Sequence, residues 1–371
     1  MIRFIKEQKV RLKNNLSKNM DFKKEIEQLV SIVLNEGASD LHLSEGRSPL
    51  IRVSSNLIPL VKKSAITKDE MKGYLNEFLN EENKALLLKD KDVDFAFSMP
   101  NARFRGNAFY HQGSISVALR YIPKKIRTLA ELSLPPILES FTRKQQGFFL
   151  CVGPIGQGKS TTLASLIEII NQTRNEHIMT IEDPVEYIYE SKKSIIDQRE
   201  VRVDTPDFKN ALIAMFRQDI DVALVGEMRD PETIATAVTA AETGHLVFST
   251  LHTNNAAQTI NRIIDSFPAS QQDQIRVQLA GSMTGIFSQR LIPRISGGLV
   301  PAYELLINNT AVMNLIREKR IHEVNTVIET SSGDGMIDMN RSLAELVRRG
   351  EITVESAFTN SLNPKNLEKM I

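Results

Sequence analysis

The sequence predicts an α/β protein whose larger part is a parallel β-sheet with helices on both faces. In the middle of the chain, strand-like and helix-like segments alternate, the strands at 147–152, 177–182, 221–226 and 245–250 and the helices at 159–171, 207–217, 231–242 and 256–265. Continuously apolar strands that alternate with helices are typical of a sheet buried on both sides. Short alternating strands among helices earlier in the chain predict a smaller α+β domain. Short helices after residue 300 predict a helical C-terminal part.

Composition limits the classes of protein that the chain can represent. Its 371 residues include 46 basic and 45 acidic side chains, for a formal charge of +1. This length predicts two or three domains, and the balanced charge argues against a nucleic-acid-binding protein, which usually has a clearly basic domain. The single cysteine, Cys151, excludes an intrachain disulfide and a four-cysteine zinc site. Since the sequence has neither a long apolar stretch nor a signal peptide, we expect a cytoplasmic protein.

Changes in composition divide the chain into five predicted segments. The start, 1–19, is basic but poorly apolar, so we interpret it as a solvated extension with only a weak attraction for an anionic surface. The small α+β domain is predicted for 20–123 and a proline-containing linker for 124–135. The α/β core is predicted for 136–300 and the helical C-terminal part for 301–371.

The elements of the small domain follow from periodicity and turn residues. Apolar residues recur at helical spacing over 25–34, and Gly37 ends that helix. A second helix is predicted over 66–88, where Thr67 and Glu70 form a capping pattern. The remaining segments alternate like strands of an antiparallel sheet, at 41–60, 93–99, 102–112 and 114–123.

A glycine-rich loop lies between the first core strand and the first core helix. Gly153, Gly158, Lys159 and Ser160 match the pattern G-x-x-x-x-G-K-[ST] in the structural context that this pattern requires. The glycines let backbone N–H groups close on phosphate oxygens, while Lys159 reaches the β- and γ-phosphates and the Ser160 hydroxyl holds Mg²⁺. The alternative, a glycine-rich turn without a ligand, is disfavoured by the flanking elements. We therefore expect ATP and Mg²⁺ to bind at Gly153, Pro154, Ile155, Gly156, Gln157, Gly158, Lys159, Ser160 and Thr161.

Hydrolysis also requires an acid near the metal and the attacking water, at the carboxyl end of a neighbouring strand. The segment DVALVGE supplies Glu227, which can orient or deprotonate water and bind a magnesium-bound water. The segment TIEDPVEY supplies Glu182 and Asp183 at the end of a strand and Glu186 just beyond it. Helix-capping or surface acids are the alternative for each cluster, and the phosphate loop favours the functional interpretation.

Two histidines, His245 and His252, flank the last core strand candidate. They are seven residues apart, so on a strand their side chains point to opposite faces and cannot form one metal site. A lone histidine is usually structural. His252, at the carboxyl end of the strand, is the better candidate for sensing phosphate or the neighbouring domain.

These motifs, in this order, resemble the secretion-ATPase superfamily and are most similar to its twitching-motility branch, which retracts type IV pili. The segments that carry the resemblance are GPIGQGKSTTLASLIEIIN, TIEDPVEY, RQDIDVALVGEMRDPETI and TAAETGHLVFSTLHTNNA. It covers about residues 20–350 and implies a RecA-like core behind a PAS-like domain. Ile155 and Gln157 replace the small polar residues that are usual in the family, and a loop that works through backbone N–H groups should tolerate them.

The resemblance also implies roles for the candidate side chains. Glu227 would be the catalytic glutamate and would reach Mg²⁺ through water, while Ser160 would bind the metal directly. His245 and His252 would belong to the histidine motif of the family. The carboxylates that would surround metal and water are Glu182, Asp183 and Glu186.

Family members are hexameric rings with ATP between the two domains, and arginines of the small domain approach the phosphates when the domains close. Arg103, Arg105 and Arg120 are the candidates here, with surface ion pairs as the alternative for each. The resemblance implies as partners other copies of this chain, an inner-membrane platform protein and a paralogous retraction ATPase. It also implies a peripheral location at the base of the pilus machine.

Other functions remain open from the sequence. An accessory retraction ATPase and an assembly or secretion ATPase belong to the same superfamily, although assembly ATPases carry a four-cysteine zinc module that one cysteine excludes. A nucleotide-gated scaffold and a RecA-like nucleic-acid motor are functions of another class. The absence of tryptophan and the balanced charge argue against the nucleic-acid motor.

Overall fold

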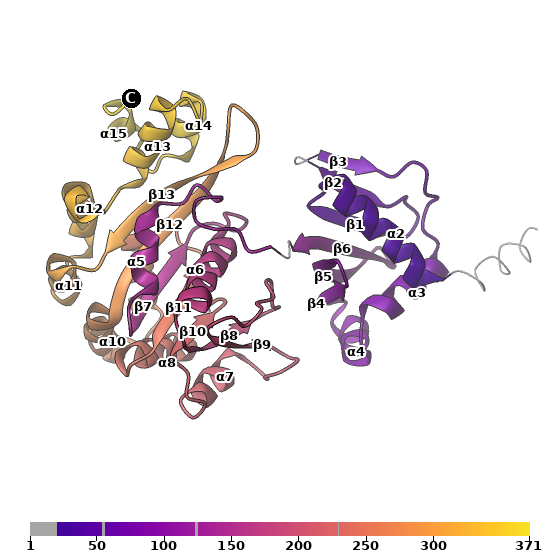
Figure 1. Ribbon diagram of the computed structural model, residues 1–371, viewed down its shortest axis with the longest axis horizontal. Helices are drawn as coiled ribbons and strands as arrows, with labels where there is room; N and C mark the ends of the chain where they lie inside the picture. Colours follow the sequence, from indigo (N-terminus) through magenta and orange to yellow (C-terminus); the bar gives the residue numbers. More distant parts are fainter. Residues whose placement is uncertain (1–20, 54–55, 123–124, 229) are drawn as a thin grey trace, which may run out of the picture. The chain divides into compact units, whose positions relative to one another are not determined.

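The computed structural model describes residues 21–53, 56–122, 125–228 and 230–371, and the chain divides into two compact units, Met1–Lys124 and Lys125–Ile371 (Figure 1). We call them the N-terminal and C-terminal units. The predicted extension at 1–19 lies outside the described residues. The described part of the predicted linker belongs to the C-terminal unit, because Leu129 and Leu134 are buried there against Phe141.

The N-terminal unit is an antiparallel sheet with helices packed on one face. Its elements are α2 (Phe22–Asn35), β1 (Asp40–Ser44), β2 (Leu50–Val53), β3 (Asn56–Pro59), α3 (Lys68–Phe78), α4 (Glu81–Asp90), β4 (Asp92–Met99), β5 (Ala102–His111) and β6 (Ser114–Ile122). The strand order is β3-β2-β1-β6-β5-β4. The core joins the inward side chains of the strands, such as Leu41 and Phe104, to Leu29 of α2 and Met71 of α3.

The capping pattern predicted at Thr67 and Glu70 is confirmed. The Glu70 N–H donates to the Thr67 hydroxyl at 3.3 Å, and the Glu70 carboxylate accepts from the Thr67 N–H at 2.6 Å. The helical segment predicted over 66–88 is confirmed, and it consists of two helices, α3 and α4. Asn80 separates them, since its side chain accepts from the Asn83 N–H at 2.8 Å and caps α4.

The C-terminal unit is built on a mostly parallel sheet with strand order β13-β12-β7-β11-β10-β8-β9. Only the β12–β13 pairing is antiparallel in the described part of this sheet. Its elements up to the middle of the sheet are η1 (Pro136–Leu138), α5 (Glu139–Thr142), β7 (Gly147–Val152), α6 (Lys159–Thr173), β8 (His177–Glu182), β9 (Ile195–Glu200), α7 (Phe208–Met215) and β10 (Val222–Val225). The later elements are α8 (Pro231–Glu242), β11 (Leu246–Leu251), α9 (Ala256–Asp265), α10 (Ala269–Ser282), β12 (Met283–Pro293), β13 (Leu299–Ile307), α11 (Thr310–Arg317), η2 (Ile321–Glu323), α12 (Val324–Thr330), η3 (Ser332–Asp334), α13 (Met339–Arg348), α14 (Val354–Asn360) and α15 (Pro364–Glu368).

Helices cover both faces of this sheet, as the sequence predicts. On one face, Phe149 and Cys151 of β7 pack with α5 and α6, and on the other Phe148 and Leu150 pack with α7 to α10. A smaller hydrophobic cluster joins α13, α14 and α15 to the end of β12 and the start of β13 (Figure 1). The predicted boundary at residue 300 falls inside β13, so the core sheet extends beyond it.

The parallel register brings the carboxyl ends of four strands to one edge of the sheet. Val152 at the end of β7 lies opposite Leu251 of β11, and Val225 of β10 lies between Ser249 of β11 and Ile181 of β8. The loops that follow these strands therefore gather at this edge, where ligands of open parallel sheets bind. Among the described residues, no helix is long and apolar enough to cross a lipid bilayer.

Candidate active site

The glycine-rich loop runs from the end of β7 at Val152 to the start of α6 at Lys159. Gly153 has φ 143° and Gly158 has φ 80°, backbone conformations that favour glycine. A Cβ atom at Gly153 would lie 2.4 Å from the carbonyl oxygen of Gln289, so the loop packs directly on β12. The side chain of Ile155 is 79% exposed, so it points away from this packing. The first turn of α6 presents its free N–H groups to the same loop.

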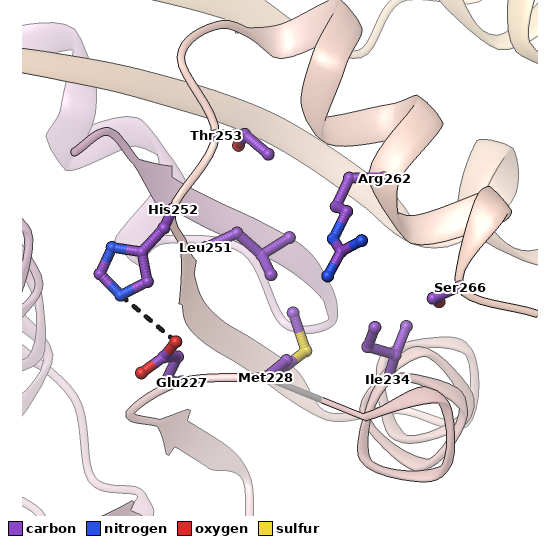
Figure 2. A pocket seen from close by; sticks show the side chains of 8 residues that line it. All are labelled: Glu227, Met228, Ile234, Leu251, His252, Thr253, Arg262 and Ser266. Atoms are coloured by element: carbon purple, nitrogen blue, oxygen red, sulfur yellow. Dashed lines mark ion pairs between the residues drawn. The ribbon is translucent and has the colours of Figure 1, made fainter. Parts of the chain in front are cut away.

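A chain of side chains connects the loop to the carboxylate of Glu227. The Lys159 ammonium donates to the carbonyl oxygens of Gly153 and Pro154 at 2.8 and 2.9 Å and lies 3.2 Å from His252 Nδ1. His252 Nε2 lies 3.2 Å from Glu227 Oε1 (Figure 2). Because an ammonium can only donate, His252 Nδ1 is the acceptor in its contact with Lys159. Burial lowers the pKa of Lys159, and the charges of Cys151, Glu227 and Glu186 oppose this shift.

The carboxylates after β8 differ in their surroundings. Glu182 is buried and accepts hydrogen bonds from the Thr180 hydroxyl at 2.7 Å and the Glu186 N–H at 3.2 Å. Burial raises the pKa of Glu182 to about 7, which makes this carboxyl able to take up or release a proton near neutral pH. Asp183 forms an ion pair with Arg202 at 2.5 Å. Glu186 is half-buried, and its charge acts on Lys159.

The structure separates His245 from the other candidates. His245 lies at the opposite edge of the sheet, because its carbonyl oxygen accepts from the N–H of Gly147 at the start of β7. A strand rises about 3.3 Å per residue, so β11 holds His245 and His252 roughly 20 Å apart. The His245 ring contacts Phe216 edge-on with centroids 5.4 Å apart, and its Nδ1 lies 3.1 Å from the Ala240 carbonyl oxygen. His245 is thus remote from the phosphate loop, and these contacts are structural.

The candidate arginines of the N-terminal unit form part of a charged row across its sheet. Arg105 lies opposite Arg120, and Asp40 lies between Arg120 and Arg52. Asp40 accepts from Arg120 Nε at 3.1 Å and lies 3.6 Å from Arg52 Nε. Arg103 is on the same face of β5 as Arg105 and donates to the Ser98 hydroxyl at 2.8 Å. Sequence reasoning missed Asp40 and Arg52, because the row exists only in the register of the strands.

A pocket of about 370 Å³ opens beside the Glu227–His252 pair (Figure 2). Its apolar side consists of Met228, Ile234 and Leu251, and its polar side includes the Arg262 side chain from α9. Figure 2 shows the Glu227 carboxylate at the rim of this pocket, next to the His252 ring.

Ser160 is suitably placed in sequence and structure for Mg²⁺. It lies in the first turn of α6, directly after Lys159. Within the described part of the chain, no group of three or more His, Cys, Asp or Glu side chains could hold a metal by itself. Mg²⁺ bound with a nucleotide takes most of its ligands from phosphate oxygens and water, so one hydroxyl and the nearby carboxylates fit this ion.

A second buried carboxylate, Glu304 of β13, supports the loop that follows His252. It accepts a hydrogen bond from the Ala256 N–H, at the start of α9, at 2.7 Å. Burial raises the pKa of Glu304 to about 7, while the Ala256 N–H opposes the shift. Sequence reasoning missed Glu304, which stands in the apolar segment LVPAYELLI and has no motif around it.

Replacing Glu304 by glutamine is expected to make the stability of the protein less sensitive to pH. The unshifted pKa is 4.5, so between this value and about 7 the folded state keeps a proton that the unfolded state has lost. This bound proton contributes roughly 3 kcal/mol to the free energy of unfolding. The contribution is complete below pH 4.5 and is lost as the pH rises through 7. Glutamine keeps an acceptor for the Ala256 N–H and carries no charge.

Calorimetric melting of the nucleotide-free protein at several pH values tests this expectation. The melting temperature of the wild type should fall relative to that of Glu304→Gln between about pH 5.5 and 8. If the melting temperatures of the two proteins differ by the same amount at every pH in this range, the Glu304 carboxyl does not titrate there.

Comparison of the sequence with known proteins and comparison of the structure with solved structures give the same result. A family model described as "Type II/IV secretion system protein" matches residues 16–300. The chain is 45% identical over 324 residues to a twitching motility protein of Neisseria gonorrhoeae, covering 86% of each chain. It is 41% identical over 348 residues to the type IV pilus retractation ATPase PilT of Pseudomonas aeruginosa, covering 92% of this chain and 99% of the relative.

One solved structure shares the fold of this chain over nearly the whole length of both proteins. The crystal structure of the pilus retraction motor PilT with bound ADP matches with a TM-score of 0.85 and 45% identity, covering 92% of this chain and 98% of that one. The chain therefore belongs to the family of type II/IV secretion system proteins.

Proposed function

We propose that this protein is an ATP-hydrolysing hexameric motor that powers the retraction of a type IV pilus. The similarity to PilT, over more than nine tenths of this chain, supports the proposal. The observation that carries it is the chain of contacts from Lys159 through His252 to Glu227, which ties the phosphate loop after β7 to an acid after β10, two strands away in the sheet.

The residues of the loop would bind the triphosphate. The backbone N–H groups of 155–161 would surround the phosphate oxygens, and Lys159 would exchange the carbonyl oxygens of Gly153 and Pro154 for the β- and γ-phosphates. The Ser160 hydroxyl would hold Mg²⁺, and Glu182, Asp183 and Glu186 would orient the waters around it. Bound Mg²⁺ supplies charge neutralisation at the β- and γ-phosphates.

The carboxylate of Glu227 would orient the attacking water and accept its proton. His252 contacts this carboxylate through Nε2 and Lys159 through Nδ1, so it would fix the position of Glu227 relative to the loop. When Lys159 moves to the phosphates, His252 loses its partner at Nδ1. We propose that His252 thereby signals to Glu227 that the loop is occupied, which is the sensing role expected of this residue.

Motion would come from the N-terminal unit. We propose that Arg103, Arg105 or Arg120 reaches the γ-phosphate when the two units close over ATP, and that hydrolysis and release let the units reopen. In a ring of six copies this opening and closing would pass to an inner-membrane platform protein, and a paralogous retraction ATPase would act on the same machine. The motor would work on the cytoplasmic side, at the base of the pilus.

Hydrolysis by the purified full chain tests the enzymatic part of the proposal. We expect steady-state release of phosphate from ATP that requires Mg²⁺ and is abolished in Lys159→Ala, with no stimulation by DNA. Binding of ATP without turnover would instead favour a nucleotide-gated scaffold. Turnover that depends on DNA would favour a nucleic-acid motor.

Deleting the gene and imaging the fibres tests the direction of force. Cells with excess pili and no twitching motility are the expected result, because assembly would continue without retraction. Cells without pili would contradict retraction and favour an assembly ATPase.

A further inference from the structure

Strand β12 supports the phosphate loop through a buried glutamine, Gln289, which is only 3% exposed. Its Oε1 accepts from the Thr162 hydroxyl of α6 at 2.6 Å, and its Nε2 donates to the carbonyl oxygen of Gln157 at 2.8 Å. One side-chain amide therefore holds both the last part of the loop and the first turn of the helix that follows it. Since both hydrogen-bonding groups of this amide are used, its orientation is fixed.

The side chain of Gln157 in turn reaches from the loop to the backbone of β12. Its Oε1 accepts from the N–H of Leu291 in β12 at 2.6 Å. Strand β7 pairs with β12 only as far as Val152 opposite Ser288, so the Leu291 N–H lies beyond the end of that pairing. Gln157 thus supplies an acceptor for this partly buried N–H where the neighbouring strand has already turned into the loop.

The backbone of the loop is close to the same residue of β12 at two points. A Cβ atom at Gly153 would lie 2.4 Å from the Gln289 carbonyl oxygen, and one at Gly158 would lie 3.0 Å from Gln289 Nε2. The two glycines at the ends of the loop are therefore held against Gln289. We call the reciprocal contacts of Gln157 with Gln289 and Leu291 the glutamine clasp.

Such a clasp acts on binding rather than on the chemical step. A phosphate loop binds through backbone N–H groups, which must point inward together, and a loop already held in that shape loses less entropy when the ligand binds. The hydrogen bonds of the clasp join Gln157 and Gln289 to Leu291 and Thr162 rather than to Glu227 or His252, so we expect it to leave the acid and its partner in place. Because Gln157 stands where small polar residues are usual in the family, the contact with Leu291 requires the longer side chain of this protein.

We propose that Gln157 and Gln289 are positioning residues that set the affinity of this protein for nucleotide by holding the phosphate loop on β12. The inference rests on the proposed function, in that it assumes a nucleotide at this loop. On this proposal Gln157 contributes to nucleotide binding, rather than being merely tolerated in place of a small polar residue.

Replacing Gln157 by serine removes the contact with Leu291 and keeps a small polar residue in the loop. The loss of one partly buried hydrogen bond is expected to weaken ADP binding by roughly two- to tenfold. We expect KM for ATP to rise by a similar factor while kcat changes less than twofold. Gln172→Ser is the matched control, since it makes the same change at an exposed glutamine near the far end of α6, where the side chain donates to Glu168.

Calorimetric titration of the full-length variants with ADP measures the affinity without any turnover, and amide hydrogen exchange at Leu291 reports whether the clasp is intact. Weaker ADP binding and faster exchange at Leu291 in Gln157→Ser, with Gln172→Ser unchanged, would support the clasp. Unchanged ADP binding in Gln157→Ser, or an equal effect of Gln172→Ser, would overturn it. A wild-type protein that does not bind ADP at all would instead contradict the nucleotide site itself.

Discussion

Replacing Glu227 by glutamine is expected to lower ATP turnover by about 10²- to 10⁴-fold and to leave nucleotide affinity within a few-fold of the wild type. Glutamine fills the same space and can still accept from His252 Nε2, but it cannot take a proton from water. Single-turnover hydrolysis together with ADP titration separates the two effects. The loss should appear in the chemical step alone.

A nearby carboxylate on the surface provides the control for Glu227. Glu232 lies on α8, five residues further along the chain, and forms an ion pair with Lys209. Glu232→Gln is expected to keep the turnover of the wild type. Turnover in Glu227→Gln within tenfold of the wild type would show that another group activates the water.

Removing the arginine that reaches the γ-phosphate is expected to lower kcat by about 10³-fold or more, the effect typical of an arginine at a transferring phosphoryl group. Arg105→Ala and Arg120→Ala are the variants to compare first, because these residues lie opposite each other on β5 and β6. Arg103→Ala completes the set. Steady-state turnover at saturating ATP is the measurement, since it excludes an effect on binding alone.

The charged row itself offers a matched control. Arg52 contacts the same Asp40 carboxylate as Arg120 but lies on the other side of it, on β2. Arg52→Ala should therefore disturb the row without lowering kcat by more than a few-fold. A triple variant of Arg103, Arg105 and Arg120 that turns over within tenfold of the wild type would exclude these arginines from the reaction.

Where local periodicity was strong, the sequence predicted the fold well. The strand at 147–152 and the helices at 231–242 and 256–265 match β7, α8 and α9 residue for residue. By contrast, β9, β12 and β13 were missed. Four of the six residues of β9 are polar, β12 follows α10 without a turn, and β13 contains Pro301, so none of them presents a strand pattern between turn residues.

The candidate site was predictable where a motif carries its own chemistry, and not where distant segments meet. The phosphate loop and Glu227 stand in short recognisable patterns, and the parallel register brings them to one edge of the sheet. Gln289 supports the loop from 132 positions along the chain, and Glu304 supports the start of α9 from 48 positions away. Contacts of this kind depend on strand order, which no local pattern specifies.

A high-resolution structure of the assembled protein with Mg²⁺ and a non-hydrolysable ATP analogue tests the central claim most directly. The account predicts the metal on the Ser160 hydroxyl, the Glu227 carboxylate facing the γ-phosphate across one water, and an arginine from 103, 105 or 120 on the γ-phosphate oxygens. A Glu227 side chain turned away from the γ-phosphate, with none of these arginines near it, would contradict the account.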